Sequence, residues 1–184
     1  MSTSSRIGND LTEFDTAVLM GRFQPFHLGH AGLLRKAFDT APKVVVVLGS
    51  SHAAPSTRNP FSAMERQEMI RSTLSDPENS RLRFIAQRDV WDGARWAREV
   101  AAAVESKACG KVALVGYHKD ATSSYLDTFP EWTLIDAGRQ GPLDATPLRE
   151  RILSRTEWRE VEPELRGKLP DPPPPPEQKG KPRY

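Results

Sequence analysis

The feature that most constrains the fold is a run of four valines and a leucine, Val44 to Leu48. β-Branched residues favour a strand, and a run without polar alternation predicts a strand buried on both faces, as in a parallel sheet. Shorter apolar runs predict further strands at 17–21, 82–86, 111–116 and 131–135. Apolar spacing and capping signals predict helices at 29–39, 62–74, 94–106, 123–128, 146–153 and 158–167. Strands that alternate with helices predict a doubly wound α/β fold with a parallel sheet.

The 184 residues are predicted to form one domain, between residues 16 and 168. Residues 1–15 are polar and rich in serine without periodicity, which is typical of a flexible leader. Seven of the 16 prolines lie between Pro170 and Pro182, with an unbroken run from Pro172 to Pro176. Such a run favours polyproline II and cannot join a core, so residues 169–184 are predicted to form a disordered tail.

Composition and charge exclude several classes of function. The formal net charge is only +2, which predicts no nucleic-acid-binding surface. Cys109 is the single cysteine, so an intrachain disulfide and a cysteine-rich metal cluster are excluded. The sequence has no apolar run long enough to cross a membrane and no apolar segment of signal-peptide length at its N-terminus. It therefore predicts a cytoplasmic protein without membrane or nucleic-acid partners, and it is compatible with a homo-oligomer.

The stretch from Gly21 to His30, with the sequence GRFQPFHLGH, joins the first predicted strand to the first predicted helix. A helix that begins near Gly29 directs its unpaired N–H groups and the positive end of its dipole toward this loop. His27 and His30 lie three residues apart at that helix start, with Arg22 beside them. Two imidazoles and a guanidinium at a helix N-terminus predict a phosphate-binding site.

Polar or glycine-containing segments also follow the other predicted strands. They are Gly49 to Asn59, Arg88 to Trp96 and Gly116 to Asp120. A further segment, Thr146 to Arg149, lies on the predicted helix 146–153. Because parallel strands end at the same edge of a sheet, these segments are predicted to converge on one ligand site.

The motif H-x-G-H after G-R-F-Q-P-F resembles the signature of the nucleotidylyltransferase superfamily. Within this superfamily, the sequence of the motif is most similar to that of nicotinamide mononucleotide (NMN) adenylyltransferases of the archaeal type and of the bacterial type fused to a Nudix hydrolase. The resemblance covers about residues 17–160. It implies a Rossmann-like fold and the transfer of the adenylyl group of ATP to NMN, which gives NAD and pyrophosphate. The sequence lacks the Nudix motif G-x5-E-x7-R-E-x2-E-E, so a stand-alone transferase domain, or such a domain as part of a longer protein, is expected.

The resemblance also implies roles for individual residues. Those expected to be catalytic are Arg22, His27, His30 and Arg149. Those expected to contact substrate or nucleotide are Gly21, Phe23, Gln24, Gly29, Gly49, Ser50, Arg58, Asn59, Asp89, Val90, Trp96, Gly116, His118, Lys119, Asp120 and Thr146. Arg22, Arg58 and Arg149 are expected to bind phosphate, Thr146 to cap the helix that faces the ATP phosphates, and Trp96 to stack on the nicotinamide ring.

A phosphate oxygen of NMN is already ionised at pH 7, so this reaction needs positioning and charge stabilisation, and no general base. No cluster of Asp and Glu predicts a dedicated metal site, so Mg²⁺ is expected to arrive bound to the phosphates of ATP.

Three alternatives stay open on the sequence. Trp96 also fits the apolar stripe of its helix, four residues before Val100, and would then belong to the core. The acceptor could instead be nicotinate mononucleotide or phosphopantetheine. A domain that senses NAD or ATP without catalysis is the third, although such a domain would not need His27, His30 and Arg149.

Overall fold

Five parallel strands form the centre of the computed structural model, which describes residues 12–53, 55–118, 121–139 and 145–153. The strands are β1 (Thr16–Gly21), β2 (Lys43–Leu48), β3 (Leu82–Ala86), β4 (Val112–Gly116) and β5 (Thr133–Asp136), and their order in the sheet is β3-β2-β1-β4-β5. β1 pairs with β2 on one side and with β4 on the other. The strand order therefore reverses at β1 and β4, and the crevice beyond their carboxyl ends is where doubly wound sheets bind ligands.

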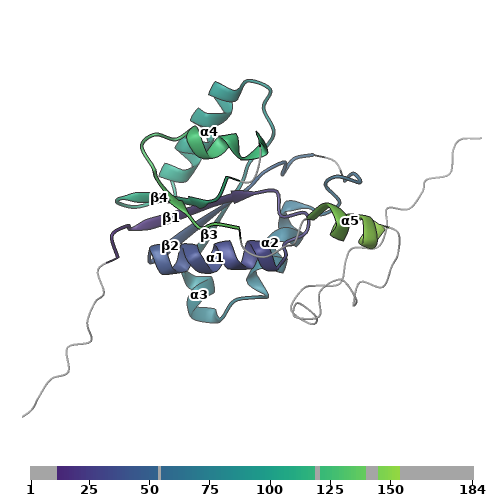
Figure 1. Cartoon of the computed structure of the whole chain (residues 1–184), viewed down its shortest axis with the longest axis horizontal. Coiled ribbons are helices and arrows are strands. Elements are labelled where there is room, and N and C mark those ends of the chain that lie inside the picture. The colour runs from purple at the N-terminus through teal and green to yellow at the C-terminus, as the bar shows by residue number, and fades with distance from the viewer. Residues whose placement is uncertain (1–11, 54, 119–120, 140–144, 154–184) are drawn as a thin grey trace, which may run out of the picture.

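Helices cover both faces of this sheet (Figure 1). They are α1 (Leu28–Thr40), α2 (Ala63–Arg71), α3 (Asp76–Arg81), α4 (Gly93–Glu105) and α5 (Ala145–Leu153), with a 3₁₀ helix, η1, at Ala121–Asp127. α1, α2 and α3 lie on the face opposite to α4. The predicted doubly wound α/β class is confirmed.

Alternate residues of each strand enter two separate hydrophobic clusters. Leu19, Val46 and Val115 pack with α1 and α2, whereas Val18, Val45 and Leu114 pack with α4. All six side chains are 0 or 1% exposed. This alternation explains why the valine run has no polar positions, because both faces of β2 are covered.

The predicted elements match the structure closely, with two differences. The helix predicted over 62–74 ends at Arg71, and a separate short helix, α3, was not predicted. α3 begins with its own capping box, in which the backbone N–H and the hydroxyl of Ser75 donate to the Glu78 carboxylate, and Pro77 in its first turn also favours a new helix start. The predicted helix at 158–167 and the predicted tail at 169–184 lie outside the described residues.

The predicted domain boundary at residue 16 also differs from the observed packing. Phe14 is 4% exposed within the cluster that contains α1, and the Asp15 carboxylate accepts a hydrogen bond from the backbone N–H of Lys111. The ordered domain therefore includes residues that were expected to belong to the leader.

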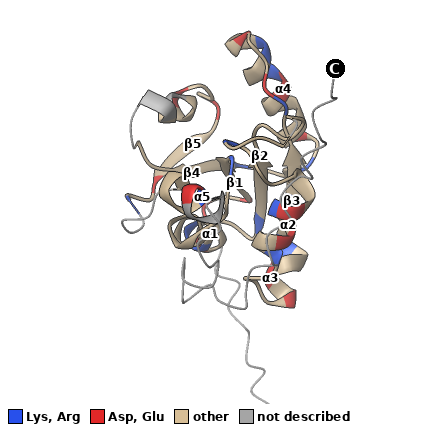
Figure 2. Cartoon of the chain, turned by 90° about the vertical axis from the view of Figure 1, so that its right-hand side faces the viewer, with Lys and Arg blue, Asp and Glu red and all other residues tan. Residues whose placement is uncertain are grey.

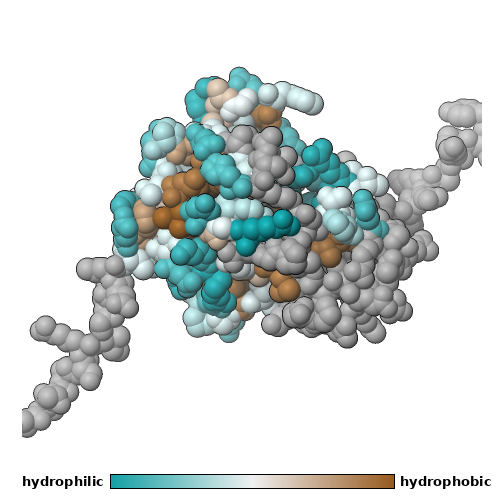
Figure 3. Space-filling model, viewed as in Figure 1, coloured by the Kyte–Doolittle hydropathy of each residue, from teal (hydrophilic) through white to brown (hydrophobic). Residues whose placement is uncertain are grey.

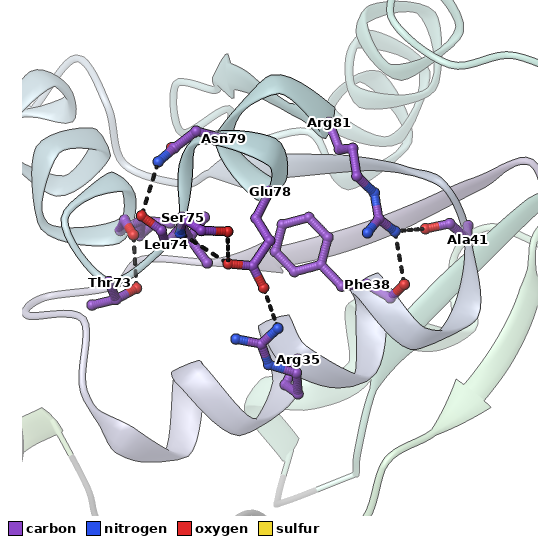
Figure 4. A network of polar contacts seen from close by, with 10 residues as sticks. Arg35, Phe38, Ala41, Thr73, Leu74, Ser75, Glu78, Asn79 and Arg81 are labelled. Atoms are coloured by element: carbon purple, nitrogen blue, oxygen red, sulfur yellow. Dashed lines mark hydrogen bonds and ion pairs between the residues drawn. The ribbon is translucent and has the colours of Figure 1, made fainter.

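α3 is attached to α1 by a polar network (Figure 4). The Arg81 guanidinium donates to the carbonyls of Phe38 and Ala41, each at 2.9 Å, and stacks over the Phe38 ring. Arg35 on α1 forms an ion pair with Glu78 on α3. The network holds α3 against α1, on the same face of the sheet.

The surface drawn in Figure 3 is largely hydrophilic, with hydrophobic residues showing in patches between charged and polar ones. Two large hydrophobic side chains in the described part of the chain are strongly exposed, Met64 at 70% and Trp91 at 107%. Across those same ranges the protein has no helix that is long and apolar enough to cross a membrane.

Candidate active site at the carboxyl ends of the strands

The loop between β1 and α1 places the two histidines at the start of α1. His27 is the N-cap residue and is 5% exposed, and His30 lies in the first turn. Their rings stack with centroids 3.8 Å apart and an interplanar angle of 27°. The Phe23 ring supports His30 edge-on at 4.9 Å. The predicted pair of imidazoles at a helix N-terminus is therefore present, with the buried Gly29 between them in the chain.

Phe23 and Gln24 shape this loop from inside the protein. Each is 1% exposed, and the Gln24 amide group exchanges two hydrogen bonds with the backbone of Phe61, at 2.8 and 2.9 Å. Phe23 has a φ of 51°, and its ring lies so close to Gly21 that a Cβ there would be 2.9 Å from Cζ. Both residues were expected to contact nucleotide, but their side chains are occupied in building the loop.

Three arginines from three different segments, Arg22, Arg58 and Arg149, lie close enough for their charges to act on one another. Burial lowers the pKa of Arg22, the positive charges of Arg58 and Arg149 lower it further, and Asp89 partly opposes them. Burial, followed by the charge of Arg58, also lowers the pKa of Arg149. Among the described residues none of these three guanidinium groups forms an ion pair with a carboxylate. Three mutually repelling cations of this kind would be stabilised by a polyanion.

Arg149 is built into the loop that carries the histidines. It is 9% exposed, and its guanidinium donates to the carbonyl of Gln24 and to the hydroxyl of Thr146, each at 2.9 Å. α5 lies across the carboxyl end of β1 in both ribbon views (Figures 1 and 2). The expectation that Thr146 caps α5 is wrong, because the helix begins at Ala145 and the Thr146 hydroxyl accepts from Arg149 within the first turn.

The ends of β2 and β3 are joined to each other beyond the sheet. The backbone N–H of Ser51 donates to Gln87, and the Ser50 hydroxyl donates to the Asp89 carboxylate at 3.0 Å. Ser50 has a φ of 50°, so the chain turns sharply directly after Gly49. The structure thus brings together Gly49, Ser50 and Asp89, as the sequence predicted.

Asn59 lies between Arg58 and the Phe61 backbone that Gln24 holds. Its side-chain oxygen Oδ1 is buried, and it has no hydrogen-bond partner within the part of the chain that the structure describes. A buried amide oxygen normally accepts a hydrogen bond. The Asn59 side chain therefore keeps one acceptor oxygen that the described residues leave unused.

Trp96 is half-buried and packs against the hydrophobic cluster of the α4 face, with its ring centroid 5.9 Å from that of Phe129. The core alternative therefore accounts for part of its surface, and the exposed part remains available to a ligand. Val90 is half-buried in the preceding loop, and Trp91 next to it is fully exposed. Trp91 was not among the predicted site residues, although it lies within the predicted segment Arg88 to Trp96.

A hollow of about 240 Å³ lies beyond β4 and β5 and is lined by Tyr117, His118, Asp136, Gly138 and Arg139. The Nε2 atom of His118 is 3.2 Å from both carboxylate oxygens of Asp127. Gly116 is packed closely, since a Cβ there would be 2.6 Å from Leu126 Cδ2. Lys119 and Asp120, which were also predicted here, lie outside the described residues.

One residue with extensive contacts in the site was not predicted. Arg66 on α2 is 0% exposed and donates hydrogen bonds to the carbonyls of Arg22 and Gly49, at 2.7 and 2.8 Å. Its position three and four residues before Met69 and Ile70, both buried, places it on the apolar side of the helix. That periodicity was the signal that could have identified a buried arginine.

The site's side chains are mainly cationic groups and hydrogen-bond donors. Within the described ranges there is no group of three or more His, Cys, Asp or Glu side chains that could hold a metal ion. The Asp89 carboxylate is engaged with the Ser50 hydroxyl. This set of groups suits phosphate oxygens.

Comparisons with known proteins agree with this geometry. The model of the cytidylyltransferase-like family matches residues 18–117, which run from β1 to the residue after β4. A nicotinamide/nicotinic acid mononucleotide adenylyltransferase from Acinetobacter baylyi is 37% identical over 143 residues, which cover 75% of this chain and 75% of that protein. A nicotinamide-nucleotide adenylyltransferase from Thermococcus kodakarensis is 29% identical over 148 residues, which cover 79% of this chain and 77% of that protein.

Solved structures show the same arrangement. A bifunctional NMN adenylyltransferase/ADP ribose pyrophosphatase from Francisella tularensis superposes with a TM-score of 0.70 and 30% identity, and its complex with AMP and manganese with a TM-score of 0.69 and 29% identity. Each match covers 77% of this chain, which spans 42% of the length of those bifunctional chains. With residues 18–117 matched by the family model and a relative 37% identical over 75% of its length, this chain belongs to the cytidylyltransferase-like family of nucleotidyltransferases.

Proposed function

We propose that this protein transfers the adenylyl group of ATP to NMN and forms NAD and pyrophosphate. The observation that carries the proposal is the cluster of Arg22, Arg58 and Arg149 beside two stacked imidazoles at the N-terminus of α1. Both substrates are anions with phosphate groups, and a cluster of fixed cations is what brings two such anions together. The relatives named as NMN adenylyltransferases support the same choice of substrates.

In this reaction a phosphate oxygen of NMN attacks the α-phosphorus of ATP. The new P–O bond forms as the bond from the α-phosphorus to the β-phosphate oxygen breaks, and pyrophosphate leaves with that electron pair. No proton has to be removed from the attacking oxygen at pH 7. The protein contributes by holding the two anions in line and by donating hydrogen bonds to the charge that develops on the phosphates.

The residues divide between these tasks by their positions. His27 and His30 face the phosphates from the start of α1, and Arg149, fixed by its bond to the Gln24 carbonyl, adds a charged fork that is already oriented. The hollow beside Tyr117 and His118 is proposed to receive the adenosine of ATP. The loop between Arg88 and Trp96 is proposed to receive the pyridine ring.

Mg²⁺ is proposed to enter with ATP, held by its phosphates and by water. The cationic and donor side chains of the site fit that arrangement, since they bind the same phosphates and do not compete for the metal. The manganese and AMP bound to the Francisella structure support a divalent cation near the nucleotide. The reaction is proposed to take place in the cytoplasm, as the sequence predicts.

The test is an assay of product formation with defined acceptors. The purified protein is incubated with ATP and Mg²⁺ and with NMN, nicotinate mononucleotide or phosphopantetheine, and both pyrophosphate and the dinucleotide are measured. NMN is expected to give NAD and pyrophosphate in equal amounts. Binding of ATP and NMN without product would refute catalysis and favour the sensor alternative.

Nicotinate mononucleotide is the second candidate acceptor. The Acinetobacter relative is named for both the nicotinamide and the nicotinic acid nucleotide, and the two differ only in one carbonyl substituent of the pyridine ring. A catalytic efficiency with nicotinate mononucleotide equal to or above that with NMN would favour it as the physiological acceptor.

A further inference from the structure

Arg66 is a cation in a place where the helix pattern calls for an apolar residue. Its side chain is 0% exposed, and Met69 and Ile70 on the same side of α2 are also 0% exposed. Burying a charge is strongly unfavourable unless hydrogen bonds compensate it. In the described part of the chain no carboxylate forms an ion pair with Arg66. All of its hydrogen bonds therefore go to neutral oxygens, and Asp89 adds a favourable charge without direct contact.

Those oxygens belong to three different segments. Nη1 donates to the carbonyl of Arg22 in the loop after β1 and to the carbonyl of Gly49 after β2. Nη2 donates to the Ser51 hydroxyl at 3.3 Å, and Nε donates to the Ser62 carbonyl at 3.1 Å, directly before α2. A planar fork with several donors can join these oxygens at once, whereas the single ammonium of a lysine cannot match the geometry.

Each joined segment carries a part of the proposed phosphate site. Arg22 belongs to the arginine cluster, and Gly49 precedes Ser50, which binds Asp89. Ser62 follows Phe61, whose backbone is held by Gln24, the residue whose carbonyl also binds Arg149. Arg66 is therefore connected to the anion-binding groups through the backbone, although its own side chain is closed off from solvent.

We propose that Arg66 is a positioning residue for the phosphate groups of the substrates. Its guanidinium fixes the backbone of Arg22 and Gly49, so that the Arg22 side chain and the turn at Ser50 are held in the arrangement that binds the triphosphate of ATP and the departing pyrophosphate. The role rests on the proposed function, but it concerns the binding of polyphosphate and can be tested without the acceptor.

The first experiment compares Arg66→Lys with Arg71→Lys as a matched control on the same helix. Arg71 is exposed and contacts the Phe84 ring and Asn79, away from the strand ends. Inorganic pyrophosphate is titrated calorimetrically at 10 °C, where circular dichroism confirms that each variant is folded, and kcat and KM for ATP are measured alongside. Arg66→Lys is expected to weaken pyrophosphate binding and to lower kcat/KM for ATP by about tenfold or more, and Arg71→Lys to change neither.

If Arg66 had only a structural role, different results would be expected. The melting temperature of Arg66→Lys would fall, pyrophosphate affinity and kcat/KM of the folded protein would stay unchanged, and that outcome would overturn the proposal. A double-mutant cycle with Arg22→Ala adds a second criterion. If Arg66 acts through Arg22, its substitution has a smaller effect in the Arg22→Ala background, whereas fully additive losses would contradict that route.

Three further outcomes also decide between the possibilities. If Arg66→Lys does not fold, Ser51→Ala removes the Nη2 partner together with the bond from the Ser51 hydroxyl to the Leu48 carbonyl, and unchanged pyrophosphate affinity in that variant overturns the proposal. If the wild-type protein binds pyrophosphate but makes no NAD from ATP and NMN, the proposed function fails, and the Arg66 role is still judged by the pyrophosphate titrations. A wild-type protein that does not bind pyrophosphate overturns the Arg66 proposal directly.

Discussion

At the scale of single residues, the stacked pair of His27 and His30 shows how a short motif becomes a rigid site. Three-residue spacing on the first turn of α1 brings the rings to 3.8 Å, and the Phe23 ring then restricts His30 from the side. Phe23 itself requires the missing side chain of Gly21. The motif therefore contains Gly21 and Phe23, which support the imidazoles, as well as the imidazoles themselves.

His30→Ala is expected to lower kcat by about 10²–10³, because it removes one preorganised donor from the site of phosphate charge. The fold should persist, since His30 is only partly buried. Turnover is measured at saturating ATP and NMN. The control is His52→Ala, which replaces an exposed histidine in the loop after β2. An unchanged kcat in a folded variant would remove His30 from the catalytic set.

Trp96→Ala is expected to have two effects, because the indole is half-buried against Phe129 and half-exposed near the proposed pyridine site. Unfolding free energy should fall by roughly 1–3 kcal/mol, below the 3–5 kcal/mol typical of a fully buried tryptophan. NMN binding should weaken by about 0.5–1.5 kcal/mol with ATP binding nearly unchanged. Separate titrations of NMN and ATP at 10 °C, together with thermal melts, measure both.

Trp91→Ala is the matched control, since its fully exposed indole should leave the melting temperature unchanged. A loss of NMN affinity in Trp91→Ala and not in Trp96→Ala would move the pyridine contact to the preceding loop.

At the scale of elements, the capping of α3 and its attachment to α1 both depend on the Glu78 carboxylate. The backbone N–H and the hydroxyl of Ser75, followed by the Arg35 guanidinium, lower the pKa of Glu78 from 4.5 to about 2. Because the folded-state pKa is below the unfolded one, the carboxylate stabilises the fold above pH 4.5, and this contribution is lost as the pH falls toward 2. The same carboxylate closes the capping box of α3 and joins it to α1 (Figure 4).

Glu78→Ala should therefore lower the melting temperature at pH 7, and the difference from the wild type should shrink between pH 4.5 and pH 2. Melting curves over this range, with Glu105→Ala on the exposed end of α4 as a control, test the expectation. A difference that stays constant down to pH 2 would show that the ionised carboxylate is not the stabilising group.

At the scale of the whole molecule, the prediction concerns the proline-rich end of the chain. Deleting residues 169–184 is expected to leave the melting temperature and activity nearly unchanged, because a segment of this composition buries little apolar surface. Thermal unfolding and the NAD-forming assay compare the truncated and full-length proteins. Loss of cooperative unfolding after truncation would mean that the segment contributes to the domain.

The sequence itself determined three features, because each depends on the pattern of neighbouring residues. They are the order of strands and helices, the buried character of β2 and the placement of the histidine pair. Contacts between distant segments depended on the tertiary structure. The bond from Arg149 to the Gln24 carbonyl spans 125 positions and that from Arg66 to the Arg22 carbonyl spans 44, and backbone acceptors leave no trace in a sequence pattern. The role of the Gln24 side chain and the packing of Trp96 against Phe129 were decided in the same way, since each needs a partner that only the assembled sheet and its loops bring within reach.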